Sequence, residues 1–305
     1  MKSSLWFIMK IMRSKKHNIL PKVYRKTLLY KSKVEYANFC LNHVEGCSHG
    51  CRYPCYAMMM KKRCGLIKDY QEWIKPKLVG NALELLDKEI PKYKSKIKFV
   101  HLCFSTDPFM YKQPEVINLT LKIIERLNQD GIKCTTLTKG TYPKALLNRK
   151  KYSIQNEYGI TLVSLSKKFK SVYEPNSSPF TRRIKSLKAL HNGGLHTWVS
   201  IEPYPTPNIV QQDLKKLLSS ISFVDKIIFG KWNYSSLVSS YKKNLKYYDE
   251  CADIVESFCK EKRIDYHIKF GTRTRKQYTR VKTERLFNKN SQEEYTPILT
   301  PLAYA

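Results

Sequence analysis

The chain has 305 residues, of which 42% are hydrophobic and 27% charged, the balance of a globular protein with one large α/β domain or two ordinary ones. Its formal net charge of +31 indicates a polyanionic partner such as DNA, RNA or an anionic surface. The apolar opening "SLWFIMKIM" is interrupted by Lys10 and is too short to span a bilayer. We therefore expect a cytoplasmic protein, without signal peptide or membrane helix, whose nine cysteines stay reduced.

Apolar, β-branched runs alternate with amphipathic stretches along the chain, a pattern that predicts parallel strands joined by helical crossovers. The predicted strands are residues 35–42, 97–105, 133–138, 159–166, 195–203, 224–230 and 265–270. The predicted helices are residues 77–90, 114–131, 142–149, 178–194, 207–220 and 247–262.

Polar residues that could bind a ligand or take part in catalysis follow these strands directly. In parallel α/β folds the functional loops lie at these carboxyl ends of the strands. The sequence "STDP" (105–108) ends the second predicted strand, "TKG" (138–140) the third and "SLS" (164–166) the fourth. We expect these segments to meet at one edge of the sheet, beside the loop "EGCSHGCRYPCYA" (45–57) that follows the first strand.

Three cysteines in that loop, Cys47, Cys51 and Cys55, lie four residues apart. Structural zinc needs four ligands, usually from two separated pairs, and His43, His49 or Cys64 would have to supply the fourth. An iron–sulfur cubane held by three thiolates leaves one iron open for a substrate-like ligand. The loop therefore favours a [4Fe–4S] cluster, with zinc as the alternative.

The order of these motifs resembles the radical S-adenosylmethionine (SAM) superfamily, within it the spore photoproduct lyase-like branch. The branch often reads N-P-Y-x-G-C-x-H-x-C-x-Y-C-Y-A, and this chain has "NHVEGCSHGCRYPCYA" (42–57). The segments "STDPF" (105–109), "LTKG" (137–140), "LVSLS" (162–166) and "YEPNSSPFTRR" (173–183) follow in the order of that branch. The resemblance spans roughly residues 38 to 210 and implies a partial (βα)6 TIM-type barrel of parallel strands.

The resemblance also implies the cofactors and the reaction. A [4Fe–4S] cluster on the three cysteines would bind SAM and cleave it reductively, giving a 5′-deoxyadenosyl radical that takes hydrogen from a substrate, as in a lyase. An electron donor is then required, either a reductase or a flavodoxin or ferredoxin. Cys134, Cys251, Cys259 or a tyrosine could return the hydrogen atom.

The residues at the strand ends suit SAM binding. Ser105, Thr106 and Asp107 offer acceptors for the SAM ammonium group, and Lys139 offers a cation for its carboxylate. Ser164 or Ser166 could bind the ribose or the carboxylate; alternate residues of a strand share a face, so that face is implicated but neither serine alone.

Three further residues complete the predicted cofactor set. Glu174 and Arg183 either contact SAM or brace each other. The superfamily's usual cysteine spacing is CxxxCxxC, with an aromatic residue before the last cysteine that lies beside the adenine. Here Pro54 makes the spacing CxxxCxxxC and displaces Tyr53 by one position, which leaves the adenine contact open.

The two ends of the chain are its most basic parts and interleave Lys and Arg with Tyr, as single-strand nucleic-acid binding surfaces do. We predict a basic N-terminal extension (residues 1–34), a radical SAM partial barrel (35–270) and a basic C-terminal extension (271–305). The favoured substrate is a nucleic acid, DNA or RNA. The alternatives are a peptide- or protein-modifying radical SAM enzyme and a non-enzymatic, zinc-dependent nucleic-acid-binding protein. The sequence does not indicate an oligomeric state.

Overall fold

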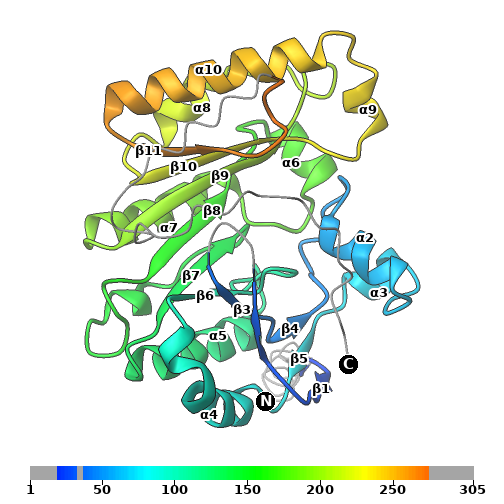
Figure 1. The fold of residues 1–305 in the computed structure, drawn as a ribbon. Helices are drawn as coiled ribbons and strands as arrows, with labels where there is room; N and C mark the ends of the chain where they lie inside the picture. Colours follow the sequence, from blue (N-terminus) through cyan, green and yellow to red (C-terminus); the bar gives the residue numbers. More distant parts are fainter. Residues whose placement is uncertain (1–18, 33–36, 275–305) are drawn as a thin grey trace, which may run out of the picture.

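Seven parallel strands follow one another in chain order across one sheet of the computed structural model, which describes residues 19–32 and 37–274 (Figure 1). The sheet has the order β11-β10-β9-β8-β7-β6-β3-β2, and only β2 is antiparallel to its neighbour. The parallel strands are β3 (Phe39–Leu41), β6 (Phe99–Leu102), β7 (Lys133–Thr138), β8 (Glu157–Thr161), β9 (His196–Tyr204), β10 (Lys226–Lys231) and β11 (Asp265–Ile268). No pairing within the described residues joins β2 (Leu29–Lys31) to β11, so the barrel is partial, as predicted.

Each parallel strand after β3 is reached through a crossover that contains an α-helix, as the alternation in the sequence predicts, except β8, whose predicted helix 142–149 is only a short 3₁₀ turn. The larger crossover helices are α4 (Ala82–Tyr93), α5 (Pro114–Gln129), α7 (Phe180–Asn192), α8 (Leu214–Ser220) and α10 (Asn244–Lys262), with the 3₁₀ turns η1 (Lys94–Lys96) and η2 (Lys144–Leu147). Pro114 occupies the first turn of α5, where its missing N–H costs nothing. The first residues of the predicted 77–90 helix instead form strand β5 (Lys77–Val79), so that part of the prediction is wrong.

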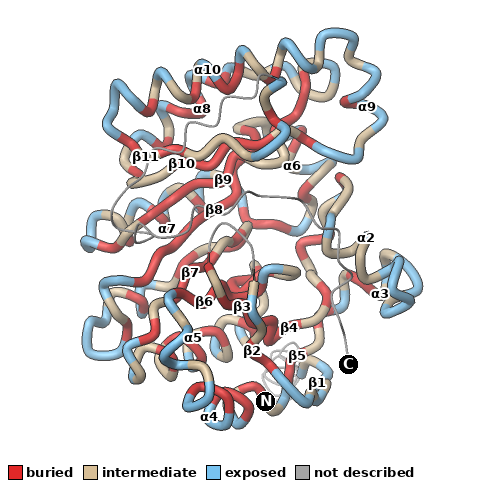
Figure 2. The backbone as a smooth tube through the Cα atoms, in the orientation of Figure 1, coloured by how far each residue is buried: buried red, intermediate tan, exposed pale blue. Residues whose placement is uncertain are grey.

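The core lies on both faces of the parallel sheet. Every residue of β6 and of β8 is buried, which is expected of parallel strands covered on both sides (Figure 2). The crossover helices contribute apolar stripes to the same core, such as Val116, Ile123, Ile124 and Leu127 of α5. The site therefore rests on a rigid support at the carboxyl ends of these strands.

The described part of the predicted N-terminal extension is built into the sheet. Leu28 and Leu29 are buried, and their backbone N–H groups donate to the buried carboxylate of Glu89, at 2.9 and 2.6 Å. Residues 1–18, which include the most basic stretch of that extension, lie outside the described residues, as do 275–305 of the C-terminal extension.

A second, small sheet lies beside the cysteine loop, in the order β1-β5-β4, with β1 at Lys22–Val23 and β4 at Val44–Glu45. Four short helices complete the described elements: α2 (Tyr56–Arg63), α3 (Tyr70–Trp73), α6 (Lys167–Tyr173) and α9 (Ser236–Ser239). Of the helices in the described part of the chain, none combines the length and hydropathy that crossing a bilayer requires.

Candidate functional site

The cysteine loop leaves strand β4 through Gly46, whose φ of 74° favours glycine. A Cβ at this position would lie 2.7 Å from the backbone oxygen of Trp73. That oxygen accepts a hydrogen bond from the backbone N–H of Cys47 at 2.8 Å, so the backbone of the first cysteine is tied to helix α3. The third cysteine, Cys55, is the N-cap residue of α2 and accepts from the backbone N–H of Met59 at 2.9 Å.

The thiols of the loop influence one another electrostatically. Burial raises the pKa of Cys47 well above its usual value, and the nearby Asp107 and Cys51 raise it further. Burial likewise raises the pKa of Cys51 to about 11, against the lowering effect of the Lys139 ammonium. Thiolates bind metal and thiols do not, so loading this site must release protons.

The thiols of the loop are the ligand type of an iron–sulfur cluster. Among the described residues, no three His, Cys, Asp or Glu side chains converge closely enough to hold one metal ion. A tetrahedral zinc site requires such convergence, because all of its ligands bind one atom at about 2.3 Å. The thiolates of a cubane each bind a different iron and therefore stand further apart. Three sulfur donors in one loop are the ligands that an iron–sulfur cluster requires.

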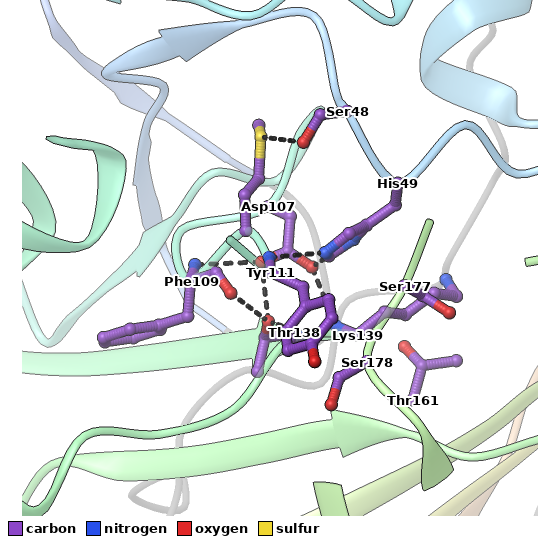
Figure 3. Close-up of polar contacts among 12 residues, drawn as sticks. Ser48, His49, Asp107, Phe109, Tyr111, Thr138, Lys139, Thr161, Ser177 and Ser178 are labelled. Carbon is purple, nitrogen blue, oxygen red and sulfur yellow. Dashed lines mark hydrogen bonds and ion pairs between the residues drawn. The ribbon is translucent and has the colours of Figure 1, made fainter. Parts of the chain in front are cut away.

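Asp107 is a hub that joins the cysteine loop to the ends of β6 and β7 (Figure 3). Its Oδ1 accepts from the Thr138 hydroxyl at 2.6 Å and from the backbone N–H of Phe109 at 2.9 Å. Its Oδ2 accepts from the backbone N–H of Lys139 at 2.8 Å and lies 3.3 Å from Nδ1 of His49. Burial alone would raise the pKa of Asp107, but His49 and these hydrogen bonds bring it below its usual value.

The other side of the His49 ring fixes its tautomer. The backbone N–H of Tyr111 donates to Nε2 at 2.9 Å, so Nδ1 carries the proton and donates to Asp107 (Figure 3). Both side chains are buried, at 1% and 8% exposure. Because Asp107 uses its acceptor positions on the protein, its geometry favours holding the site together over binding a ligand ammonium directly.

A second buried hydrogen-bond network, centred on Glu174, holds the Tyr53 side chain in place. The Tyr53 hydroxyl donates to Oε1 of Glu174 at 3.0 Å, and Arg183 donates to Oε2 of Glu174 at 2.5 Å. Arg183 also donates to the backbone oxygens of Thr161 and Ser178, both at 2.9 Å. Of the two roles predicted for Glu174 and Arg183, this geometry favours bracing. Burial would raise the pKa of Glu174, but Arg183 and Lys139 lower it.

Lys139 brings a positive charge between these two networks. Its Nζ lies 5.4 Å from the centroid of the Tyr53 ring. Burial lowers the pKa of Lys139, but the nearby Cys51 and Glu174 outweigh this effect and raise it. The chain turns directly after it at Gly140, where a Cβ would lie 1.7 Å from the Phe109 backbone oxygen, so only glycine fits. This half-buried ammonium is a cation available to a ligand carboxylate near the thiols.

The serines and the threonine that were predicted to bind SAM differ in their surroundings and in their hydrogen-bond partners. Ser105 is half-buried after β6 and its backbone N–H donates to Asn42, while the Thr106 hydroxyl donates to the backbone oxygen of Val44 at 3.2 Å. Strand β8 ends at Thr161, so the expectation that Ser164 and Ser166 share one strand face is wrong. Their segment leaves the sheet, and the Ser166 hydroxyl caps helix α6 by accepting from the backbone N–H of Phe169.

An aromatic group behind Tyr53 was not predicted. Trp232, which directly follows β10, is 3% exposed and packs edge-on against Tyr53 and Tyr173, each at 5.4 Å between ring centroids. Phe169 packs against Trp232 at 6.3 Å. The segment "GKWNY" (230–234) ends the sixth predicted strand, and this position indicated that Trp232 lies at the same edge of the sheet as the site.

The radical SAM superfamily model matches residues 41–221, more than half of the chain and all of the site residues described above except Trp232. An uncharacterized protein of Acidianus two-tailed virus is 27% identical over 192 residues, which are 60% of this chain and 61% of that protein. One of Methanocaldococcus jannaschii is 24% identical over 182 residues, 60% of this chain and 66% of that protein. The chain thus spans less than two thirds of each of these relatives.

Solved structures of spore photoproduct lyase have a similar fold. A double mutant with bound AdoMet and the dinucleoside spore photoproduct superimposes with a TM-score of 0.58 at 14% identity, covering 81% of both chains. A single mutant with the same dinucleoside has a TM-score of 0.58 at 13% identity, covering 81% of this chain and 80% of that one. At this identity the likeness shows the fold alone.

Proposed function

The chain belongs to the radical SAM superfamily, whose members bind a [4Fe–4S] cluster and SAM, and we propose that it uses them to take hydrogen from a nucleic acid. In this proposal Cys47, Cys51 and Cys55 hold the cluster. The cluster and SAM supply the electron transfer and the 5′-deoxyadenosyl radical. The chain's own residues bind SAM, orient it and exclude water.

The observation that carries the proposal is the position of Lys139. Its ammonium lies near enough to Cys51 and Glu174 for both to raise its pKa, and it faces the Tyr53 ring. A cation beside the thiols is suited to the carboxylate of an amino acid bound at the cluster. The half-buried Ser105 is the candidate acceptor for the ammonium of that amino acid, because Asp107 and Thr106 already bond to the protein.

The remaining predicted residues act by positioning. Asp107 holds the backbone of Lys139 and, through His49, the loop between the first two cysteines. Glu174 and Arg183 hold Tyr53, whose ring contacts both Lys139 and Trp232 and can border the adenine. The aromatic side chains around Trp232 make this wall of the site apolar, which excludes water from a reactive radical.

Charge supports a nucleic-acid substrate. The formal net charge is +31, and each phosphate neutralised by Lys or Arg releases counterions, which favours binding. The fold neighbour was solved with a dinucleoside photoproduct, which agrees with that substrate class. We assign capture of the strand to the basic residues of the two ends, 1–18 and 275–305, because residues 19–32 pack into the fold, and the chemistry to residues 35–270.

Isotope transfer tests the substrate class directly. The reconstituted protein is incubated with SAM, dithionite and one of three fully deuterated pools: DNA, RNA or peptides. We expect deuterium in 5′-deoxyadenosine, or in recovered SAM, only with a nucleic-acid pool. Transfer from the peptide pool alone would assign the protein to the peptide-modifying class. Binding of oligonucleotide and zinc, with no SAM cleavage in any pool, would point to the zinc alternative.

A further inference from the structure

Helix α2, which begins at the residue after Cys55, differs from the other α-helices in the described part of the chain because none of its residues is buried. Tyr56 is 51% exposed and Met59 39% exposed. Figure 2 shows α2 and α3 standing out from the body of the molecule beside the sheet. A helix with exposed apolar side chains and no buried face lacks the usual stabilisation by packing.

The exposed residues of α2 lie on one side of it. At 3.6 residues per turn, Tyr56, Met59, Lys62 and Arg63 fall within an arc of about 120°. Leu66, 47% exposed, follows the last turn. The surface formed by these five residues, here called the α2 face, combines apolar and basic side chains. Tyr, Met and Arg are the residue types enriched in protein–protein interfaces.

The charged side chains of the α2 face itself, Lys62 and Arg63, are both positive. The chain from Gly46 to Lys68 carries five Lys or Arg residues and no Asp or Glu. Lys62 and Arg63 are exposed and form no ion pair with the residues that the structure describes. A partner on this face is therefore acidic, because like charges across an interface are costly.

A short route links the α2 face to the candidate cluster. The backbone N–H of Met59 donates to the backbone oxygen of Cys55 at 2.9 Å, which joins an exposed residue to a proposed iron ligand through one hydrogen bond. The networks of Lys139 and Tyr53 do not include any residue of α2. A partner on α2 would thus approach the cysteines without occupying the SAM side.

We propose that the α2 face is the docking site for a small acidic one-electron carrier, a flavodoxin or ferredoxin, which reduces the cluster through Cys55. The proposal rests on the proposed function, since only a cluster that cleaves SAM reductively needs this electron. The carrier loses one electron and the cluster gains it; no bond forms or breaks and no proton moves. Electron-transfer complexes are small and transient, which suits a surface of about one short helix.

The test is a stopped-flow measurement of cluster bleaching in the reconstituted, full-length protein. The reductant is a photoreduced acidic flavodoxin in one arm and dithionite in the other. The variant is Lys62→Glu/Arg63→Glu. The control is Lys215→Glu/Lys216→Glu, which makes the same charge change at exposed positions of α8, far from α2 in Figure 1. Binding of the oxidised flavodoxin and of a labelled oligonucleotide is measured on the same proteins.

We expect the α2 variant to be reduced by flavodoxin about tenfold more slowly at low salt, with the gap closing as salt is added. The control variant should behave as the wild type, and dithionite should reduce all three proteins equally. An unchanged flavodoxin rate in the α2 variant overturns the proposal, as does an equal loss with dithionite, which would place the effect in the cluster itself. Loss of oligonucleotide binding alone would assign the face to nucleic acid. Dithionite-driven SAM cleavage tests the proposed function separately.

Discussion

Nδ1 of His49 lies 3.3 Å from Oδ2 of Asp107, and this buried contact joins the cysteine loop to the carboxyl ends of β6 and β7. The loop contributes few apolar side chains to the core, so its shape depends on such hydrogen bonds and on the turn at Gly46. His49 thereby positions Cys47 and Cys51, between which it stands in sequence.

Replacing His49 with Ala should loosen the loop. The change removes one of the partners of Asp107 and leaves the Tyr111 N–H without its acceptor, and an unsatisfied buried group costs about 1–3 kcal/mol. We expect a lower free energy of unfolding in urea and faster loss of iron to a chelator. His49→Asn, which can keep an N–H toward Asp107, should lose less. Equal iron retention in all three proteins would show that the contact does not position the thiols.

Lys139→Met should weaken SAM binding and leave iron content unchanged. A missing charge-assisted hydrogen bond costs about 1.5–3 kcal/mol, so the affinity should fall about ten- to a hundredfold. Lys144→Met, an exposed position on η2, is the matched control. Equilibrium binding of SAM to the reconstituted proteins measures the effect. An affinity for SAM in Lys139→Met equal to that of the control would remove Lys139 from the site.

Local patterns in the sequence predicted the parallel strands because buried β-branched runs and amphipathic crossovers have distinct periodicities. The run 133–138 coincides with β7, and the predicted helix 114–131 differs from α5 only at its end. Strands of two or three residues, such as β4 and β5, are too short to have a period. The sequence "YAMMMKKR" of α2 likewise lacks the apolar periodicity from which a helix packed on the core is predicted.

The candidate site was predicted by residue type and only partly by role. Cysteine spacing and strand ends identified Asp107, Lys139, Glu174 and Arg183, which the structure brings into two adjoining networks. Their partners depend on tertiary contacts between distant segments, so spacing alone could not show that Glu174 and Arg183 bind each other. Ser166 was assigned to a strand because the apolar run continued, whereas its hydroxyl caps α6.

Glu157 should make the protein less stable as the pH rises. It lies at the start of β8, the end remote from the site, and burial raises its pKa from 4.5 to about 7. Between these two values the unfolded chain ionises first, so stability falls with rising pH; above pH 7 the loss is constant. Glu157→Gln should therefore gain up to roughly 3 kcal/mol over the wild type between pH 4.5 and 8.

Urea unfolding at several pH values measures this gain, with the exposed Glu84→Gln as control. A wild-type stability that rises between pH 5 and 7 relative to Glu157→Gln would contradict the buried, uncharged carboxyl.

Removing residues 275–305 should reduce nucleic-acid affinity. This segment carries six Lys or Arg and three Glu. The salt dependence should become shallower by about 0.9 for each phosphate that the shortened chain no longer neutralises. The cut follows Thr274 because its backbone N–H donates to Asp249 at 2.8 Å, and Arg273 binds Glu256 at 2.5 Å. Fluorescence anisotropy with a labelled oligonucleotide at several salt concentrations measures both quantities. Identical affinity and slope in the two chains would show that this segment does not bind nucleic acid.

The central claim is that Cys47, Cys51 and Cys55 hold a cluster that cleaves SAM. The most direct measurement is the amount of 5′-deoxyadenosine formed by anaerobically reconstituted protein with SAM and dithionite, together with its iron content. The wild type and Cys64→Ala, which changes an exposed cysteine outside the motif, should bind about four irons per chain and form the product. Replacing any one of the three cysteines with Ala should abolish product, and replacing all three should abolish iron binding. Product formation by the triple variant, or its absence in a wild type that carries four irons, would contradict the claim.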